Sequence, residues 1–327
     1  MHSLYQTYNN ILNDNKYRYY PNQIWNCLPD KILRCDDDAK SFITSFIQAG
    51  GKRNDTISEL IYRLPQYRAK HTVSTYLLGI VLYTQPYIKN IVDKQLDLLV
   101  TRENKTKTDR FLYVWFLICL FHDLGYAYET NSLEISKIRH KKPTIYKRAK
   151  KRNMLPDFYT TELVQNYQKY RKHCMKVYDH GIYGGLIMYK KLYDKFKEEK
   201  EWIKIFQTTA NIIMVHNIYF QNRNKLQTID YEKHNLHALI YEGNECRRIF
   251  FDQHPLLFLF NLVDSIEPLK HMDMTILHNM HIEYHNDLHI RVLDEEANQT
   301  MANQISDINS WLSDASRITN DTYRIVL

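Results

Sequence analysis

The chain has 327 residues, of which 44% are hydrophobic, so it falls in the ordinary globular range with one large domain or two unequal domains. Its longest apolar run, Phe111 to Phe121, is too short to cross a bilayer, and Met1 to Tyr8 lacks the build of a secretory signal; we therefore expect a cytoplasmic protein with no membrane partner. The net charge of +7 is modest, and the five cysteines form no CxxC pair, so free thiols are expected.

Apolar residues recur every three or four positions along much of the chain, and Gly and Pro number only eight each. This spacing is typical of amphipathic helices and predicts a mainly α protein. We divide the chain into an N-terminal helical cap at 1–66, a helical core domain at 67–272 and a small C-terminal α+β appendage at 273–327.

The N-terminal cap contains two short periodic segments, IWNCLPDKILRC and SFITSFIQ, bounded by the turn-like stretches DDD and AGGKRND. No residue pattern there indicates a site. In the core domain the periodic segments are longer and more apolar, and they predict helices at 68–83, 108–126, 180–196, 201–220 and 254–269.

A polar stretch rich in Lys and Tyr at 129–175 separates the second of these helices from the third. It is too long for a tight helix connection and predicts a lid or an inserted helical layer. Within it, residues 139–152 read RHKKPTIYKRAKKR. Such a cluster either attracts an anionic substrate or a short nucleic acid, or forms a solvated surface loop.

The appendage begins with alternating polar and apolar residues at 281–294, which predict a hairpin turning at Asn286-Asp287, and a helix is expected at 297–315. Histidines are dense in this part of the chain, but the alternation puts several of them on one strand face near a turn. We therefore assign a surface role to His234, His237, His278, His281, His285 and His289.

Six ionisable side chains lie within or at the end of the apolar core helices. A buried imidazole or carboxylate without a partner costs on the order of a few kcal/mol, and a shared metal ion would give all six a partner. They are His71, His122, Asp123, His180, His216 and Asp264.

The adjacent pair His122 and Asp123 follows the apolar run ending in ICLF. Neighbouring helix residues point about 100° apart, so both can face one ion only where the local geometry is fixed. Asp264 is a single carboxylate in the apolar segment FLFNLVDSIEP. It is either a metal ligand or a cap for a neighbouring helix.

The order His, His-Asp, His, His, Asp resembles the HD-domain superfamily of metal-dependent phosphohydrolases, over the span from Arg68 to Lys270. The pieces that carry the resemblance are RAKH at 68–71, HDLG at 122–125, DH with GG at 179–185, VHN at 215–217 and VD at 263–264. The family fold is a helical bundle, so the resemblance implies an HD-type helical core.

The resemblance also implies a ligand assignment. His71, His122, Asp123 and Asp264 would hold one ion, and Asp123 would bridge to a second ion held by His180 and His216. Imidazole with carboxylate suits Mn, Fe, Ni or Zn better than Ca or Mg, so two divalent transition metal ions are expected as cofactors. Two neighbouring ions lower the pKa of a shared water and clamp phosphoryl oxygens, which makes a metal-bridging hydroxide the expected nucleophile.

Several polar residues near these ligands are further candidates. Arg68 and Lys70, beside His71, could bind a phosphate and are grouped with Asp123 as catalytic candidates, although a surface role fits Arg68 equally. Asn217 and Asn261 could orient ligands. Asp179 either orients a ligand or is an exposed residue at a helix start.

The chain also departs from parts of the family pattern. It lacks the His-His-Glu and Gly-Tyr-Pro signature of the cyclic-di-GMP branch, which disfavours that activity. A lysine often found three or four residues after the doublet is replaced by Tyr126 and Ala127, and Glu129 has no partner nearby in sequence, so a surface role is expected for it.

The leading hypothesis is a phosphohydrolase or phosphodiesterase acting on a small phosphorylated substrate: a nucleotide, cyclic nucleotide or short oligonucleotide. Tyrosines near the ligands could stack on a nucleobase or simply pack in the core. The alternatives are a di-iron oxygenase of the HD-domain type, which shares the ligand set, and a nucleic-acid-binding protein or nuclease. The oligomeric state is left open.

Overall fold

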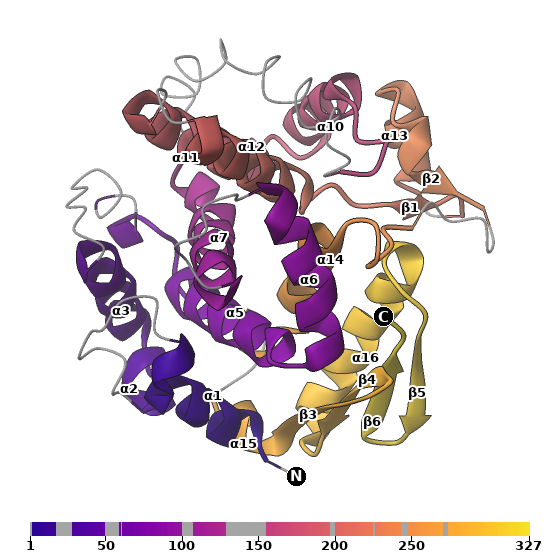
Figure 1. The fold of residues 1–327 in the computed structure, drawn as a ribbon. Coiled ribbons are helices and arrows are strands. Elements are labelled where there is room, and N and C mark those ends of the chain that lie inside the picture. Colours follow the sequence, from indigo (N-terminus) through magenta and orange to yellow (C-terminus); the bar gives the residue numbers. More distant parts are fainter. Residues whose placement is uncertain are drawn as a thin grey trace.

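The computed structural model describes residues 2–17, 28–49, 59, 61–99, 107–128, 155–196, 200–224, 226–242, 248–270 and 274–327. Within them the protein is mainly helical, with a small antiparallel sheet near its C-terminal end, which confirms the predicted fold class (Figure 1). None of the helices in these ranges is long and apolar enough to cross a membrane.

The N-terminal layer consists of α1 (Leu4–Asn13), α2 (Pro29–Leu33) and α3 (Asp36–Ala49). Ser3 begins α1 with a capping box, in which its hydroxyl accepts from the Gln6 amide and the Gln6 side chain accepts from the Ser3 amide. The buried Tyr8 hydroxyl reaches the carbonyl of Ser74, so this layer is anchored to the first core helix.

The centre of the molecule contains α5 (Arg68–Tyr83), α6 (Pro86–Leu99), α7 (Lys107–His122) and α14 (Pro255–Ile266). The helix predicted at 68–83 has the predicted bounds, whereas the one predicted at 108–126 ends at His122 and continues as the 3-10 helix η3 (Leu124–Tyr128). This early end matters, because it places the predicted His-Asp pair at a helix terminus.

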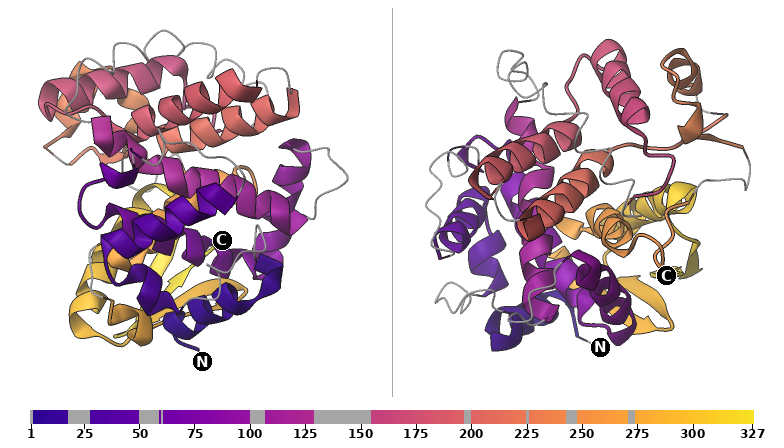
Figure 2. Two further views of the ribbon diagram at one scale, coloured as in Figure 1. Left: turned by 90° about the vertical axis from the view of Figure 1, so that its left-hand side faces the viewer. Right: turned by 45° about the horizontal axis from the view of Figure 1, so that its top comes forward.

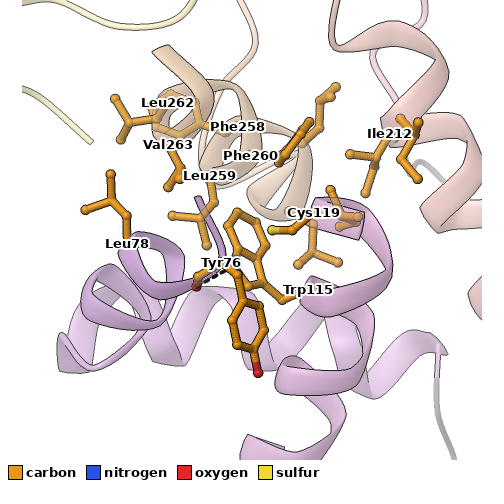
Figure 3. Packing of buried hydrophobic residues seen from close by; sticks show 14 of the residues in the cluster. Tyr76, Leu78, Trp115, Cys119, Ile212, Phe258, Leu259, Phe260, Leu262 and Val263 are labelled. Carbon is orange, nitrogen blue, oxygen red and sulfur yellow. Dashed lines mark hydrogen bonds between the residues drawn. The ribbon is translucent and has the colours of Figure 1, made fainter. Parts of the chain in front are cut away.

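The core between α5, α7 and α14 is built around Trp115 (Figure 3). Its indole nitrogen donates to the carbonyl of Tyr76 at 3.0 Å, and its ring meets Phe260 edge-on at 5.9 Å between centroids. Satisfying the indole N–H allows this large side chain to be fully buried. The three helices that supply the first four predicted ligands are thereby held in fixed contact.

A second helical layer covers one side of this centre, formed by α10 (Thr161–Cys174), α11 (His180–Phe196) and α12 (Lys200–Val215) (Figure 2). Helix α11 approaches α7 closely at Gly184, where an added Cβ would lie 2.2 Å from the carbonyl oxygen of Phe121. Only glycine permits this approach, which brings the start of α11 to the end of α7.

Most of the predicted lid lies outside the described residues. This applies to 129–154, which include Glu129 and the basic cluster 139–152. The remainder of that stretch contains α10, which Thr160 caps by accepting from the Leu163 amide. After α12 come the short helix α13 (Thr228–Lys233) and a two-residue parallel pairing of β1 (Gln221–Asn222) with β2 (Ile240–Tyr241).

The appendage contains the short helix α15 (Ile276–Asn279), which is followed by β3 (Met280–His285) and β4 (Asp287–Val292). These strands form the predicted hairpin, and Asn286 adopts a positive φ of 69° in its turn. Helix α16 (Glu295–Trp311) follows, and β5 (Ala315–Thr319) and β6 (Thr322–Ile325) complete a sheet with the order β3-β4-β6-β5. The sequence analysis did not predict this second hairpin.

Candidate metal centre

Three core helices bring the first four predicted ligands together. His71 lies in the first turn of α5, His122 is the last residue of α7, Asp123 follows it, and Asp264 lies in the last turn of α14. All four are buried, with exposed fractions between 0% and 8%. The ligand atoms of His71, His122 and Asp123 lie within 4.8 Å of one another, so these three residues form a group that could hold a metal ion.

The distances define a tight cluster. Nε2 of His71 lies 3.2 Å from Nε2 of His122 and 2.9 Å from Oδ1 of Asp264. Oδ1 of Asp123 lies 3.4 Å from Nε2 of His122. Asp264 thus contacts the imidazole of His71, which belongs to the three-residue group.

The second helical layer adds two histidines beside Asp123. His180 begins α11, and its Nε2 lies 3.8 Å from Oδ1 of Asp123. His216 follows the end of α12, and its ring centroid lies 5.5 Å from those of both His122 and His180. All six side chains selected from the sequence therefore occupy one place in the fold.

Hydrogen bonds on the outer side of the imidazoles fix how they are turned. Nδ1 of His122 donates to the carbonyl of Cys119 at 2.7 Å, and Nδ1 of His216 donates to that of Ile213 at 2.6 Å. Because the proton sits on Nδ1, the Nε2 lone pair of each ring is free to face the cluster. This is the tautomer that a metal ligand requires.

Glu267 gives His71 the same orientation and was not among the predicted residues. Oε2 of Glu267 accepts from Nδ1 of His71 at 2.7 Å, and the carboxylate is completely buried. Its other oxygen accepts from the Leu269 amide at 2.7 Å. A carboxylate behind a ligating histidine fixes the ring and increases its basicity. The sequence signal that could have identified Glu267 is its position three residues after the candidate ligand Asp264.

The charges in the cluster shift one another's pKa values strongly. Burial lowers the pKa of His71, but hydrogen bonds to Asp264 and Glu267 outweigh it and raise the pKa to about 9. His122 has its pKa lowered to about 4 by burial and by the charge on His71. Burial also lowers the pKa of His180.

The pKa values of the two carboxylates are lowered, although burial alone would raise them. Burial raises the pKa of Asp123, yet His122, His71 and Arg68 together hold it well below the ordinary range. For Asp264, burial is outweighed by Lys270 and His71, and its pKa is likewise depressed. Both groups are therefore ionised at neutral pH, which is the form that binds a cation.

Gly125 allows η3 to reach the beginning of α11. A Cβ at this position would lie 1.8 Å from the carbonyl oxygen of His180. The contact brings the ring of Tyr126 into a stack with His180, at 3.9 Å between centroids. Tyr126, which follows the His-Asp doublet, therefore supports the ring of His180.

Arg68 completes this stack. Its guanidinium lies 4.2 Å from the centroid of the Tyr126 ring, and Nη1 lies 3.4 Å from Oδ2 of Asp123. Lys70 is placed differently: its amide donates to Asp36, and it lines a cavity of about 770 Å³ together with Lys270. Of the two cations predicted beside His71, only Arg68 has a described contact with one of the six ligands.

Lys270 is a second cation at the site that the sequence analysis did not select. Its Nζ lies 3.0 Å from Oδ2 of Asp264, and the ion pair raises the pKa of the lysine. It belongs to the 3-10 helix η6 (Pro268–Lys270) directly after α14.

Asp179 is buried, which corrects the alternative of an exposed helix-start residue. Its Oδ1 accepts from the Ile182 amide and caps α11, while Oδ2 accepts from Nδ2 of Asn217 at 2.7 Å. Asn217 in turn lies 3.5 Å from Nδ1 of His180. The pair holds the start of α11 against the end of α12, as its burial and its capping role require.

The appendage histidines assigned to the surface have partners away from the candidate site. His281, His285 and Glu283 share one face of β3, and His289 pairs with Glu283 across the hairpin. His278 stacks on Tyr5. Among the described residues, the group at His71 is the one found with ligand atoms close enough for a metal ion.

A cavity of about 290 Å³ opens directly onto the ligands. His216 and Asp264 line it, together with Lys270 and with Asn261, one helical turn before Asp264. A small molecule entering it would meet two proposed ligands and a lysine.

Comparisons of the chain with protein-family models, curated proteins and solved structures found no match. The fold and the site thus define a mainly helical protein with a buried His71, His122 and Asp123 group that could hold a metal ion.

Proposed function

We propose that this protein is a metal-dependent phosphohydrolase or phosphodiesterase that hydrolyses a phosphoester of a nucleotide, cyclic nucleotide or short oligonucleotide in the cytoplasm. The observation that carries the proposal is the convergence of six buried candidate ligand side chains beside a cavity that Lys270 lines. Their order along the chain resembles that in the HD-domain superfamily, and phosphoester hydrolysis is proposed from this resemblance.

The donor set fits a transition metal ion. Two imidazoles and two carboxylates meet at the first position, and the rings of His71, His122 and His216 each use Nδ1 as an outward donor. Two Nε2 atoms at 3.2 Å, both directed inward, repel each other unless a proton or a cation lies between them. Mixed nitrogen and oxygen ligands of this kind favour Mn, Fe, Ni or Zn.

The position of Asp123 supports a binuclear arrangement. Its Oδ2 lies 3.9 Å from His71, on the side of the first group, and its Oδ1 lies 3.8 Å from His180, on the side of the second helical layer. A carboxylate between two sets of histidines is suited to bridge two ions. His180 and His216 would complete the second position.

Divalent ions at these positions would polarise a phosphoryl oxygen and lower the pKa of a bound water. The chain's own residues would orient the substrate around them. Arg68 presents a guanidinium held over the ring of Tyr126, which suits a phosphate oxygen, and Lys270 adds a positive charge at the cavity wall. Ion pairs hold these two side chains in place: Arg68 pairs with Asp123, and Lys270 pairs with Asp264.

The test combines metal analysis with a substrate screen. The full chain is loaded with Mn²⁺, Fe²⁺, Ni²⁺ or Zn²⁺ in turn, and hydrolysis of bis-p-nitrophenyl phosphate is followed alongside a panel of nucleotides and short oligonucleotides. We expect metal-dependent hydrolysis that the Asp123→Ala variant lacks. Substrate-dependent oxygen uptake by the iron-loaded protein, without hydrolysis under any metal, would overturn the proposal in favour of the di-iron oxygenase.

A further inference from the structure

Helix α16 of the C-terminal appendage supplies part of the wall of the cavity that opens onto the ligands. Gln304, Asp307 and Trp311 line this cavity of about 290 Å³ together with His216 and Asp264. Helix α16 packs against α14, which carries Asp264 (Figure 1). The appendage thus contributes side chains to the site, although it supplies none of the six proposed metal ligands.

Two residues that line this cavity each have one buried amide atom without a hydrogen-bond partner among the described residues. Nδ2 of Asn261 and Oε1 of Gln304 have no hydrogen bond to any part of the chain that the structure describes, and their residues are only 2% and 9% exposed. A buried polar atom left unpaired costs about 1–3 kcal/mol. Since one atom is a donor and the other an acceptor, a ligand edge that carries an acceptor and a donor would satisfy both.

Aromatic rings accompany these amides. Tyr219 and Trp311 line the same cavity, and together with Asp307 they also line a neighbouring cavity of about 290 Å³. The second cavity is rich in aromatic residues, which come from α10, α13 and the segment after α12: Tyr167, Tyr170, Phe220 and Tyr231. Aromatic side chains beside unpaired amide atoms are suited to a planar heteroaromatic group. Such a group stacks on a ring with its face and forms hydrogen bonds with the amides along its edge.

We infer that this cavity binds a nucleobase. Asn261 donates from Nδ2 to a ring nitrogen or carbonyl of the base, Gln304 accepts an N–H of the base at Oε1, and Trp311 and Tyr219 cover its faces. Each nucleobase offers donors and acceptors side by side on its Watson–Crick edge. The inference rests on the proposed phosphoesterase function and assigns the choice of substrate to α16, with the phosphoester of the same molecule directed toward His216 and Asp264.

Calorimetric titration of the full-length, Mn²⁺-loaded chain tests the inference. The titrants are AMP, GMP, CMP and UMP, with ribose 5-phosphate as a probe that has the phosphate and the sugar but no base. The readout is the ratio of the dissociation constant for ribose 5-phosphate to that of the tightest nucleotide. We expect a ratio of about 10 or more, because stacking and two hydrogen bonds act only on the base.

Variants separate the amide contacts from general effects on the fold. Gln304→Leu and Asn261→Leu replace the amide by apolar groups and are expected to reduce the ratio severalfold, toward 1. Gln299→Leu is the matched control, since it makes the same change on an exposed position of α16 outside the cavities, and it should keep the wild-type ratio. Thermal melting of each variant verifies that it is folded.

A ratio near 1 in the wild-type chain, or an unchanged ratio in both leucine variants at the amides, would overturn the inference. Neither result would affect the proposed function, because hydrolysis of bis-p-nitrophenyl phosphate requires no base. Conversely, absence of that hydrolysis with a preserved preference for nucleotides would remove the phosphoesterase and leave a nucleotide-binding site.

Discussion

Oε2 of Glu267 lies 2.7 Å from Nδ1 of His71, on the side of the ring that faces away from His122 and Asp264. Glu267 follows the last residue of α14, and its amide bonds to the carbonyl of Val263. One helix end therefore carries both a proposed ligand, Asp264, and the group that orients the ligand opposite it.

Replacing Glu267 by Gln should weaken metal binding without removing a ligand. The amide can still meet Nδ1 of His71 but no longer raises the basicity of the ring, so we expect metal affinity to fall about 10- to 100-fold. Competition with a metal-binding dye measures this. Glu295→Gln, at an exposed position of α16, is the control, and equal affinities in the two variants would show that Glu267 has no such role.

Metal loading should stabilise the fold. An ion that binds only the folded chain adds about 2.7 kcal/mol to the free energy of unfolding at a free concentration 100 times its dissociation constant. We expect the melting temperature to rise when Mn²⁺ is added to chelator-treated protein and to return after chelation. Asp123→Ala should show little of this rise. A melting temperature that does not respond to any of the four metals would contradict a metal centre.

The proposed second ion should be removable separately from the first. His180→Ala takes away a ligand on the α11 side only, so metal content should fall from two equivalents per chain to one. His173→Ala, an exposed histidine at the end of α10, should leave both in place. Elemental analysis of the purified proteins gives the count. One equivalent in the wild-type chain, unchanged in His180→Ala, would establish a mononuclear site.

Arg68 should act on the substrate through a geometry that lysine cannot reproduce. Its guanidinium stacks on Tyr126 next to Asp123, so Arg68→Ala should reduce kcat/KM for a phosphodiester about 10- to 100-fold, which corresponds to about 1.4–2.8 kcal/mol. Arg68→Lys should recover only part of the lost kcat/KM, because an ammonium group neither stacks on an aromatic ring nor binds a phosphate through two parallel hydrogen bonds. The exposed Arg63→Ala is the control, and a similar loss in both alanine variants would argue against a specific role.

The metal-free protein should lose stability as the pH rises from 6.5 to 9. The pKa of His71 is raised to about 9 in the fold from 6.5, so the folded chain holds a proton that the unfolded chain releases. This stabilisation is complete below pH 6.5 and is lost through pH 9, with an amplitude on the order of 2–3 kcal/mol.

Urea unfolding in the presence of a chelator at pH 6.5, 7.5 and 9 measures this dependence. His71→Gln serves as the reference, since it removes the titrating group. The same decline in the variant as in the wild-type chain would assign the pH dependence to other groups.

The sequence by itself determined the helical class and the set of candidate ligands. Apolar periodicity marks α5 and α11 at their observed bounds, because burial of one helix face imposes a spacing that is visible residue by residue. His71, His122 and Asp264 were identifiable because a polar side chain in an apolar helix needs a partner. The first hairpin of the appendage could be predicted for a similar local reason, the alternation of residues around Asn286-Asp287.

Only the tertiary structure decided which other residues join these ligands. Glu267, Lys270 and Gln304 lie in segments whose local pattern is ordinary, and their roles depend on contacts with α5, α14 and the cavity. Likewise, Arg68 and Lys70 are indistinguishable as two cations beside His71, yet the start of α5 directs one toward Asp123 and the other into a different cavity. Contacts between distant segments arise from packing, which no single stretch of sequence encodes.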